Sequence, residues 1–208
     1  MSPVPAALSQ IGSVRDLRRA QILDEARRLV SEGGLQALTF AALEARLSFT
    51  RGVITYHFDN KAEIVDAVLD SAVEEIDRAN ARAVMAAGAI EDKLRAVIAH
   101  TVGGFIEHVE AGRILLNFWA RLPRDQHAAR INARLYRRYR EHSVALLRAG
   151  QRLGRFRADV DVEALAAHMV GTVIGIVTQS YFEPGAIDPD AAVAEAVATL
   201  LARLRVAG

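Results

Sequence analysis

The stretch from residue 39 to residue 61, TFAALEARLSFTRGVITYHFDNK, constrains the fold of this chain more than any other. Its apolar residues recur at helical spacing on both sides of a short polar interruption at Ser48: Phe40, Leu43, Leu47, Ile54 and Phe58. The pattern predicts two short helices joined by a tight turn, followed by the start of a longer helix.

The second of these helices has an outer face that favours contact with another molecule. When Ile54 is placed on the buried side, Gly52, Thr55 and Tyr56 point away from the core. Glycine within a short helix costs about 1 kcal/mol relative to alanine, and a DNA backbone that approaches closely would explain its presence. An outward tyrosine suits a phosphate or base contact. The alternative interpretation is the ordinary exposed surface of a helical hairpin.

The start of the longer helix also favours an anion. Asn60 has the character of an N-cap residue, with Glu63 as its capping-box partner. Lys61 would then occupy the first helical position, where the helix dipole disfavours a cation. A phosphate beside the backbone N–H groups of this helix start would account for the lysine.

The segment FTRGVITYHFDNKAEIVDAV resembles the helix-turn-helix signature of the tetracycline-repressor (TetR) family of bacterial transcription regulators. This resemblance implies a DNA-contacting set: Thr39, Thr50, Arg51, Gly52, Tyr56, His57 and Lys61. We expect Val53 and Thr55 to read base edges or methyl groups beside Tyr56, which completes the predicted DNA contacts. Two positions depart from the family pattern. Thr55 replaces the first residue of an aromatic pair, and Ser48 replaces the usual glycine of the turn.

The remainder of the chain has helical periodicity almost throughout, so we expect an all-α protein of about nine helices. Residues 1–60 are expected to form the DNA-binding domain, with a mobile tail over 1–13, and residues 61–208 a ligand-sensing and dimerisation domain. Gly103-Gly104 indicates a kink or a close helix crossing. Pro123 is expected to separate two helices.

The last two predicted helices, at about 161–182 and 192–206, carry more apolar surface than one subunit needs. We therefore expect them to form a subunit interface. The family resemblance implies the same, because its members pair these helices into a four-helix dimer interface. The string NFWARLPRDQ and the segments that follow it more loosely resemble the body of the subgroup that contains the choline-responsive repressor.

Polar residues within the apolar helices of the body are candidates for a ligand pocket, since buried polar groups need hydrogen-bond partners. The candidates are His100, Asn117, Trp119, His168, Thr172 and Gln179. Partners within the helical core or across a dimer are the alternative. Tyr136, Tyr139 and the arginines around them are expected to form a solvated helix face.

The composition narrows the function classes. The chain has no cysteine, and no histidine pair has the spacing of a zinc site, so we expect no metal, no cofactor and no disulfide. Motifs of nucleotide-binding and hydrolytic enzymes are absent, which indicates a protein that is not an enzyme. No apolar run reaches 18 residues, so we expect a cytoplasmic protein with no membrane partner.

Charge is unevenly distributed, because residues 113–157 hold 12 basic and 2 acidic groups, whereas residues 1–61 hold 8 and 6. The most basic segment is therefore not the predicted DNA-binding one. The interpretation that follows is a homodimeric repressor that binds a near-palindromic operator and responds to a small-molecule effector. The alternative is a helical small-molecule-binding or scaffold protein whose helix-turn-helix no longer reads DNA.

Overall fold

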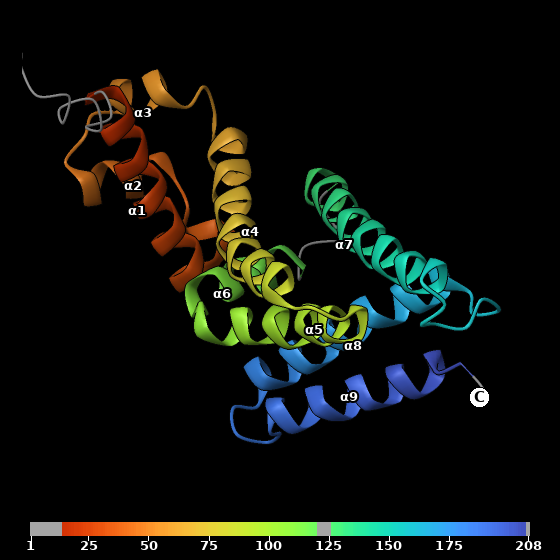
Figure 1. The fold of residues 1–208 in the computed structure, drawn as a ribbon. Coiled ribbons are helices and arrows are strands. Elements are labelled where there is room, and N and C mark those ends of the chain that lie inside the picture. The colour runs from red at the N-terminus through yellow and green to blue at the C-terminus, as the bar shows by residue number, and fades with distance from the viewer. Residues whose placement is uncertain (1–13, 120–125, 207–208) are drawn as a thin grey trace, which may run out of the picture. The chain divides into compact units, whose positions relative to one another are not determined.

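The computed structural model describes residues 14–119 and 126–206, and these residues form nine helices (Figure 1). In chain order they are α1 (Val14–Ala37), α2 (Phe40–Leu47), α3 (Arg51–His57), α4 (Lys61–Ala86), α5 (Ile90–Glu107), α6 (Val109–Trp119), α7 (Gln126–Arg152), α8 (Val162–Phe182) and α9 (Pro189–Leu204). The predicted all-α fold is confirmed. The tail expected over residues 1–13 and the break expected at Pro123 lie outside the described residues.

The chain divides into two compact units, Met1–Ser71 and Ala72–Gly208, here called unit 1 and unit 2. The division falls inside α4, so this helix contributes to both units. Unit 1 contains α1, α2, α3 and the first part of α4. Unit 2 contains the rest of α4 and the five helices that follow.

Unit 1 is built around the apolar residues that the sequence pattern selects. Leu43, Ile54 and Phe58 are fully buried, as is Ile22 of α1, and α1 packs against both α2 and α3. An ion-pair group adds to the contact between α1 and α2. Arg46 donates hydrogen bonds to Glu25 at 2.9 Å and to Glu32 at 2.8 Å.

Helix ends in the structure follow the capping residues of the sequence. Thr39 caps α2, because its hydroxyl accepts a hydrogen bond from the Ala42 N–H at 3.1 Å. The Asn60 side chain accepts one from the Glu63 N–H at 3.0 Å, and the Glu63 carboxylate accepts from the Asp59 N–H at 2.7 Å. This is a capping box shifted by one residue at its second bond.

One helix is interrupted, and one boundary differs from the sequence expectation. Helix α1 is broken by a kink at Gly34, whose φ of 73° is non-helical, before it continues to Ala37. Helix α9 begins at Pro189 and not at residue 192, because the Asp188 carboxylate caps it and proline fits the first helical turn.

In unit 2, α8 packs against α5, α7 and α9, with α8 and α9 side by side (Figure 1). The expected close approach at Gly103-Gly104 occurs at Gly104, where an added Cβ would lie 3.3 Å from Ile76 of α4. Tyr181 of α8 contacts both α5 and α6, since its hydroxyl lies 2.6 Å from the Phe105 carbonyl oxygen and 3.4 Å from that of Val109.

Helix α8 is apolar on nearly every side, and by length and composition alone it could cross a membrane. Its two faces have different surroundings, however. Met169, Val173 and Val177, spaced four residues apart, line an internal cavity. The opposite face carries small and polar residues that unit 2 leaves exposed.

Candidate nucleic-acid interface and ligand cavity

Unit 1 contains a groove of about 450 Å³ between the start of α1 and the outer face of α3. The residues that line it are Val14, Arg15, Arg18, Thr50, Gly52, Val53, Tyr56 and His57. Five of the nine predicted DNA contacts are therefore gathered on one face. The arginines of α1 supply positive charge beside them.

Tyr56 is the most prominent side chain of this face, with 68% of its surface exposed. The Arg15 guanidinium lies 5.5 Å from the centre of its ring, which fixes a cation beside an outward hydroxyl. Gly52 is exposed next to it, and an added Cβ would meet only the Thr50 hydroxyl at 3.9 Å. The backbone of α3 is therefore open to close approach from outside.

Three further predicted contacts are already engaged within the chain. The Thr55 hydroxyl donates to the Arg51 carbonyl at 3.0 Å, which leaves its methyl group and oxygen lone pairs for a partner. The Arg51 guanidinium lies 4.7 Å from the centre of the Phe40 ring. Lys61 donates to the Leu35 carbonyl at 3.2 Å, and its side chain is otherwise exposed.

His57 occupies the floor of the groove and not its rim. It is only 8% exposed, and its Nδ1 atom has no hydrogen-bond partner among the described residues. Burial lowers the pKa of His57, and nearby arginines of α1 lower it further. The imidazole is therefore held neutral, and only a small part of it is accessible for the phosphate contact that the sequence predicts.

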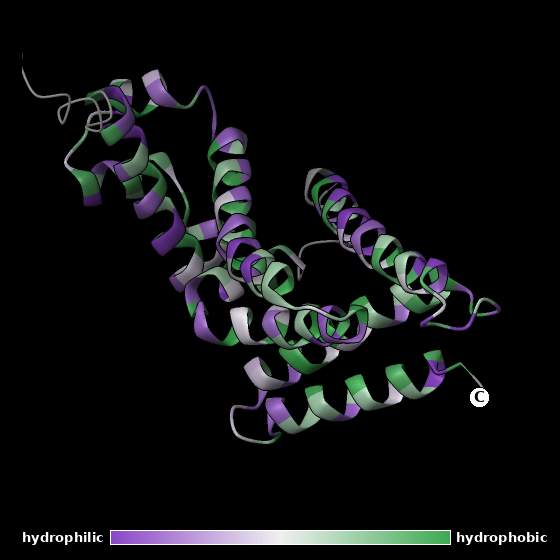
Figure 2. Cartoon of the chain, in the orientation of Figure 1, coloured by the Kyte–Doolittle hydropathy of each residue, from purple (hydrophilic) through white to green (hydrophobic). Residues whose placement is uncertain are grey.

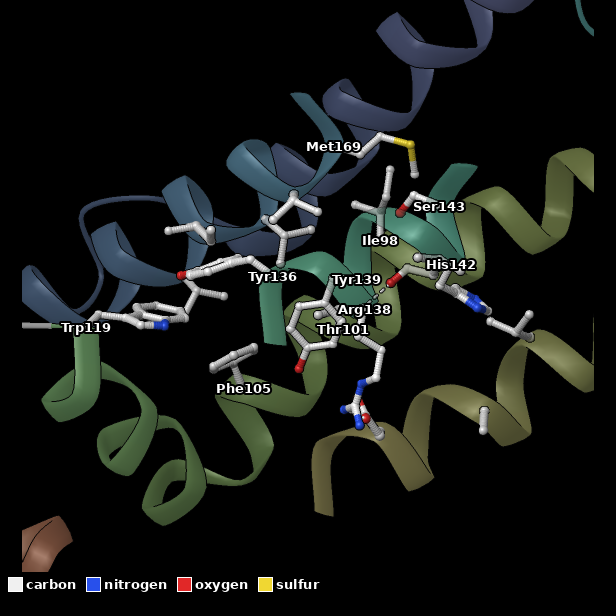
Figure 3. Close-up of a pocket in the computed structure, with 18 of the residues that line it drawn as sticks. Ile98, Thr101, Phe105, Trp119, Tyr136, Arg138, Tyr139, His142, Ser143 and Met169 are labelled. Atoms are coloured by element: carbon white, nitrogen blue, oxygen red, sulfur yellow. Dashed lines mark hydrogen bonds and ion pairs between the residues drawn. The ribbon is translucent and has the colours of Figure 1, made fainter. Parts of the chain in front are cut away.

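Unit 2 contains a cavity of about 450 Å³ between α4, α5, α7 and α8, with Trp119 at the end of α6 on its edge (Figure 3). Most of the wall is aliphatic or aromatic. It includes Val97 and Ile98 of α5 and Met169, Val173 and Val177 of α8. A volume of this size is typical of cavities that hold small organic ligands.

Three aromatic rings stand together at one side of the cavity (Figure 3). The Phe105 and Trp119 rings are 5.9 Å apart between centres, and the Trp119 and Tyr136 rings are 6.2 Å apart and stacked at 29°. Burial raises the pKa of Tyr136 to about 12 and raises the pKa of Tyr139 further. Both phenols are therefore protonated donors at neutral pH.

The charged groups of the cavity are paired with each other. Arg138 of α7 forms an ion pair with Asp77 of α4. Burial raises the pKa of Asp77, although Arg138 and His142 act in the opposite direction. The described wall thus offers no free carboxylate.

Of the six predicted pocket residues, Trp119 lines this cavity and the other five do not. His100, His168 and Gln179 are exposed on the outside of α5 and α8. The Asn117 amide donates to the Arg113 carbonyl at 2.9 Å, and the Thr172 hydroxyl to the His168 carbonyl at 3.0 Å, so both are satisfied by their own helices. The correction has a simple reason: an all-apolar helix gives no sequence signal for which face is the inner one.

Sequence reasoning also missed Tyr136 and Tyr139, which were expected on a solvated face. Both line the cavity, together with Ser143. Their positions are separated by three and four residues, which places them on one face of α7. Hydrophilic and hydrophobic residues alternate along this helix (Figure 2). Phasing α7 on its buried Leu135 and Leu147 would have found them.

Comparison with known proteins identifies the relatives of both units. Residues 90–206 match the family described as BetI-type transcriptional repressor, C-terminal, and residues 22–68 match bacterial regulatory proteins of the tetR family. The chain belongs to the TetR family of transcriptional regulators. Within this family it carries a repressor body of the BetI type.

The relatives by sequence include the HTH-type transcriptional regulator BetI of Burkholderia mallei, 28% identical over 162 residues, which are 76% of this chain and 80% of that protein. The corresponding regulator of Burkholderia cenocepacia is 26% identical over 159 residues, covering 76% of this chain and 81% of that protein. Each of these relatives is a transcriptional regulator, and we found no enzyme motif in this chain.

Solved TetR-family structures share the fold. A regulator from Chloroflexus aurantiacus has a TM-score of 0.80 at 20% identity and covers 93% of this chain and 98% of its own. A putative regulator from Saccharomonospora viridis, solved in complex with choline, has a TM-score of 0.75 at 19% identity and covers 93% and 100%. As a TetR-family member the chain is a DNA-binding, ligand-responsive transcriptional repressor, and the scaffold alternative is not favoured.

Proposed function

We propose that unit 1 is the operator-binding domain and that the exposed face of α3 enters the major groove. The observation that carries this proposal is the placement of Tyr56, Gly52 and Thr50 on one open face, beside the arginines of α1. In this arrangement Thr39, Arg51, His57 and Lys61 contact phosphates and fix the register. Val53, Thr55 and Tyr56 contact base edges or methyl groups.

The protein acts as a homodimer in this proposal, through the faces of α8 and α9 that unit 2 leaves exposed. On α8, Gly171, Gly175 and Gln179 follow one another at helical spacing. On α9, exposed alanines at 191, 194, 198 and 202 form a matching stripe. Small residues allow helices of two subunits to pack closely. Three of the residues expected in a pocket, His168, Thr172 and Gln179, belong to this interface instead.

Two-fold symmetry then sets the operator. A dimer presents two copies of α3, so the DNA target is near-palindromic, with half-sites that lie in successive major grooves. An effector in the cavity of unit 2 binds one conformation of the body better than the other, and this difference shifts the dimer away from DNA. Asp77 lies on α4, the helix that both units share. We place this regulator in the cytoplasm, where the operator is found.

Binding of the full-length protein to its own upstream DNA and to scrambled duplex, from about 50 to about 300 mM salt, tests this function. We expect the upstream duplex to bind at least about 10³-fold tighter than the scrambled one. Affinity should fall steeply with salt. Equal, weak binding to both duplexes would contradict the proposal for this operator, and a genomic selection of bound fragments would then decide whether unit 1 reads DNA at all.

Tyr56→Ala tests the orientation of α3. We expect the variant to lose about tenfold to a hundredfold in affinity for the specific duplex, in line with about 1–3 kcal/mol for a base contact. Leu153→Ala, which changes an exposed apolar residue of unit 2, is the matched control and should keep wild-type affinity. A loss within twofold for Tyr56→Ala would show that another face binds DNA.

A further inference from the structure

The wall of the unit 2 cavity restricts the chemistry of the effector, and this inference rests on the proposed function of that cavity. The aliphatic part of the wall comes from α5 and α8, where Ile98, Met169, Val173 and Val177 face the interior. Binding is favourable when such a surface covers apolar atoms of a ligand, because these atoms leave water. Burying a strongly hydrated ion against the same surface is unfavourable. Most of the ligand must therefore be apolar.

The aromatic group does not form a cage for a quaternary ammonium ion. Such a cage turns several ring faces toward one central cation. Here the Trp119 and Tyr136 rings lie 29° from parallel with their centres 6.2 Å apart, so these two rings do not turn their faces toward one shared central point (Figure 3). The described lining also holds one carboxylate, Asp77, and its charge is balanced by Arg138. A cationic headgroup therefore finds no free counter-charge among the described lining residues.

Two hydrogen-bond donors of the lining residues have no acceptor among the described residues. The indole N–H of Trp119 and the hydroxyl hydrogen of Tyr139 are both shielded from water, and neither is donated to an acceptor there. An indole nitrogen donates only, and the phenol of Tyr139 stays protonated because burial raises its pKa. A buried donor without an acceptor is costly, and a ligand oxygen would remove that cost.

We propose that the effector is a largely apolar molecule that carries a carbonyl-type acceptor oxygen, which accepts a hydrogen bond from the hydroxyl of Tyr139. A neutral ketone or ester and a carboxylic acid share this oxygen. A small quaternary ammonium ion such as choline lacks the apolar body. A structural relative was solved with choline, but at 19% identity it shares only the fold.

Trp119 is the only tryptophan of the chain, so its fluorescence reports directly on the cavity. The full-length protein is titrated with probes that share an unbranched ten-carbon chain, 2-decanone, decanoic acid and decyltrimethylammonium, and also with 2-acetylnaphthalene and choline. We expect at least one carbonyl probe to change the Trp119 emission with saturation and to bind at least tenfold tighter than both ammonium compounds. The ketone and the acid distinguish a neutral from an ionised acceptor.

Tyr139→Phe removes the proposed donor and keeps the ring and the reporter. We expect it to weaken the carbonyl probe about tenfold while the empty protein keeps its melting temperature. Tyr181→Phe removes a phenol that already has an acceptor outside the cavity, so it should lower stability and leave probe affinity unchanged. Equal probe affinity in Tyr139→Phe and wild type would refute the assigned contact.

Tighter binding of choline or decyltrimethylammonium than of every carbonyl probe would overturn the proposal, as would no binding of any carbonyl probe. Release of the upstream duplex is measured in the same samples. Specific DNA binding that choline relieves would leave the proposed function standing and refute this effector class. A protein that binds a carbonyl probe but does not bind its operator would support this effector class and contradict the proposed function.

Discussion

At the scale of single residues, unit 1 contains two residues whose conformation or burial in the fold lowers the stability of the protein. Ser48, which joins α2 to α3, has φ of 54°, and it is the one non-glycine residue with positive φ in the part of the chain that the structure describes. His57 is buried beneath the exposed face of α3 without a partner for Nδ1. Each position makes a separate prediction.

Ser48→Gly should stabilise the protein. The left-handed conformation costs a serine about 1–2 kcal/mol, and glycine adopts it freely at a smaller cost in the unfolded chain. We expect a net gain of about 0.5–1 kcal/mol in the free energy of unfolding, measured by urea denaturation. Ser48→Ala is the control and should give no gain, because alanine keeps the steric penalty.

His57 should make unit 1 sensitive to acid. Its folded-state pKa lies below its unfolded value, so protonation favours the unfolded chain. Stability should therefore decrease as the pH falls below about 6.5, the ordinary pKa of histidine. Thermal melts at about pH 7.5 and about pH 5.5 should differ less in His57→Gln than in wild type. His100→Gln, which changes an exposed histidine, should reproduce the wild-type difference.

At the scale of helices, the joint between α5, α6 and α8 depends on Gly112. A Cβ at this position would lie 2.0 Å from the Tyr181 hydroxyl oxygen and 3.0 Å from the Phe105 carbonyl oxygen. The hydroxyl is held there by its hydrogen bond to Phe105. The same three helices also carry cavity-lining residues, Phe105, Trp119 and Val177.

Gly112→Ala should therefore destabilise the protein by about 1–3 kcal/mol, the usual cost of overpacking a filled site. Gly103→Ala is the matched control, because a Cβ at Gly103 meets nothing within 4 Å. In a helix that control should gain about 0.5–1 kcal/mol. Chemical denaturation of the two variants beside wild type measures both effects. Equal stabilities would mean that Tyr181 moves aside at no cost.

At the scale of the whole molecule, the exposed stripes of α8 and α9 connect dimer formation to DNA binding. An added Cβ meets nothing within 4 Å at Gly171 or at Gly175, so a single chain has room at both positions. Across a closely packed helix interface the same side chains would collide. Larger side chains at these two positions should therefore prevent dimer formation without preventing the chain from folding.

The double variant Gly171→Leu and Gly175→Leu should keep the helical content of wild type and elute as a single chain. Sedimentation and light scattering measure the mass. Affinity for the near-palindromic operator should fall by at least about a hundredfold, because each half-site is then bound alone. Ala145→Leu on α7, also exposed, should remain dimeric. A double variant that stays dimeric would place the interface elsewhere.

The sequence determined the features that local spacing carries. Ile54 and Phe58 at helical spacing placed Tyr56 outward, and Thr39 and Asn60 marked helix starts. These signals depend on residues three or four apart on one helix, so the direction of a side chain and the start of a helix can be predicted without knowing the contacts with distant segments.

Tertiary structure alone decided where the ligand cavity lies and which faces line it. Helix α8 is apolar on nearly every side, so the sequence could not tell which face lines the cavity, where Val173 lies, and which face carries Thr172 and Gln179. Trp119 comes from α6 and Tyr139 from α7, and only the packing of α5, α6, α7 and α8 brings both side chains to one cavity. The physical reason is that burial is a property of the neighbours that a side chain meets, and these neighbours lie far away in the sequence.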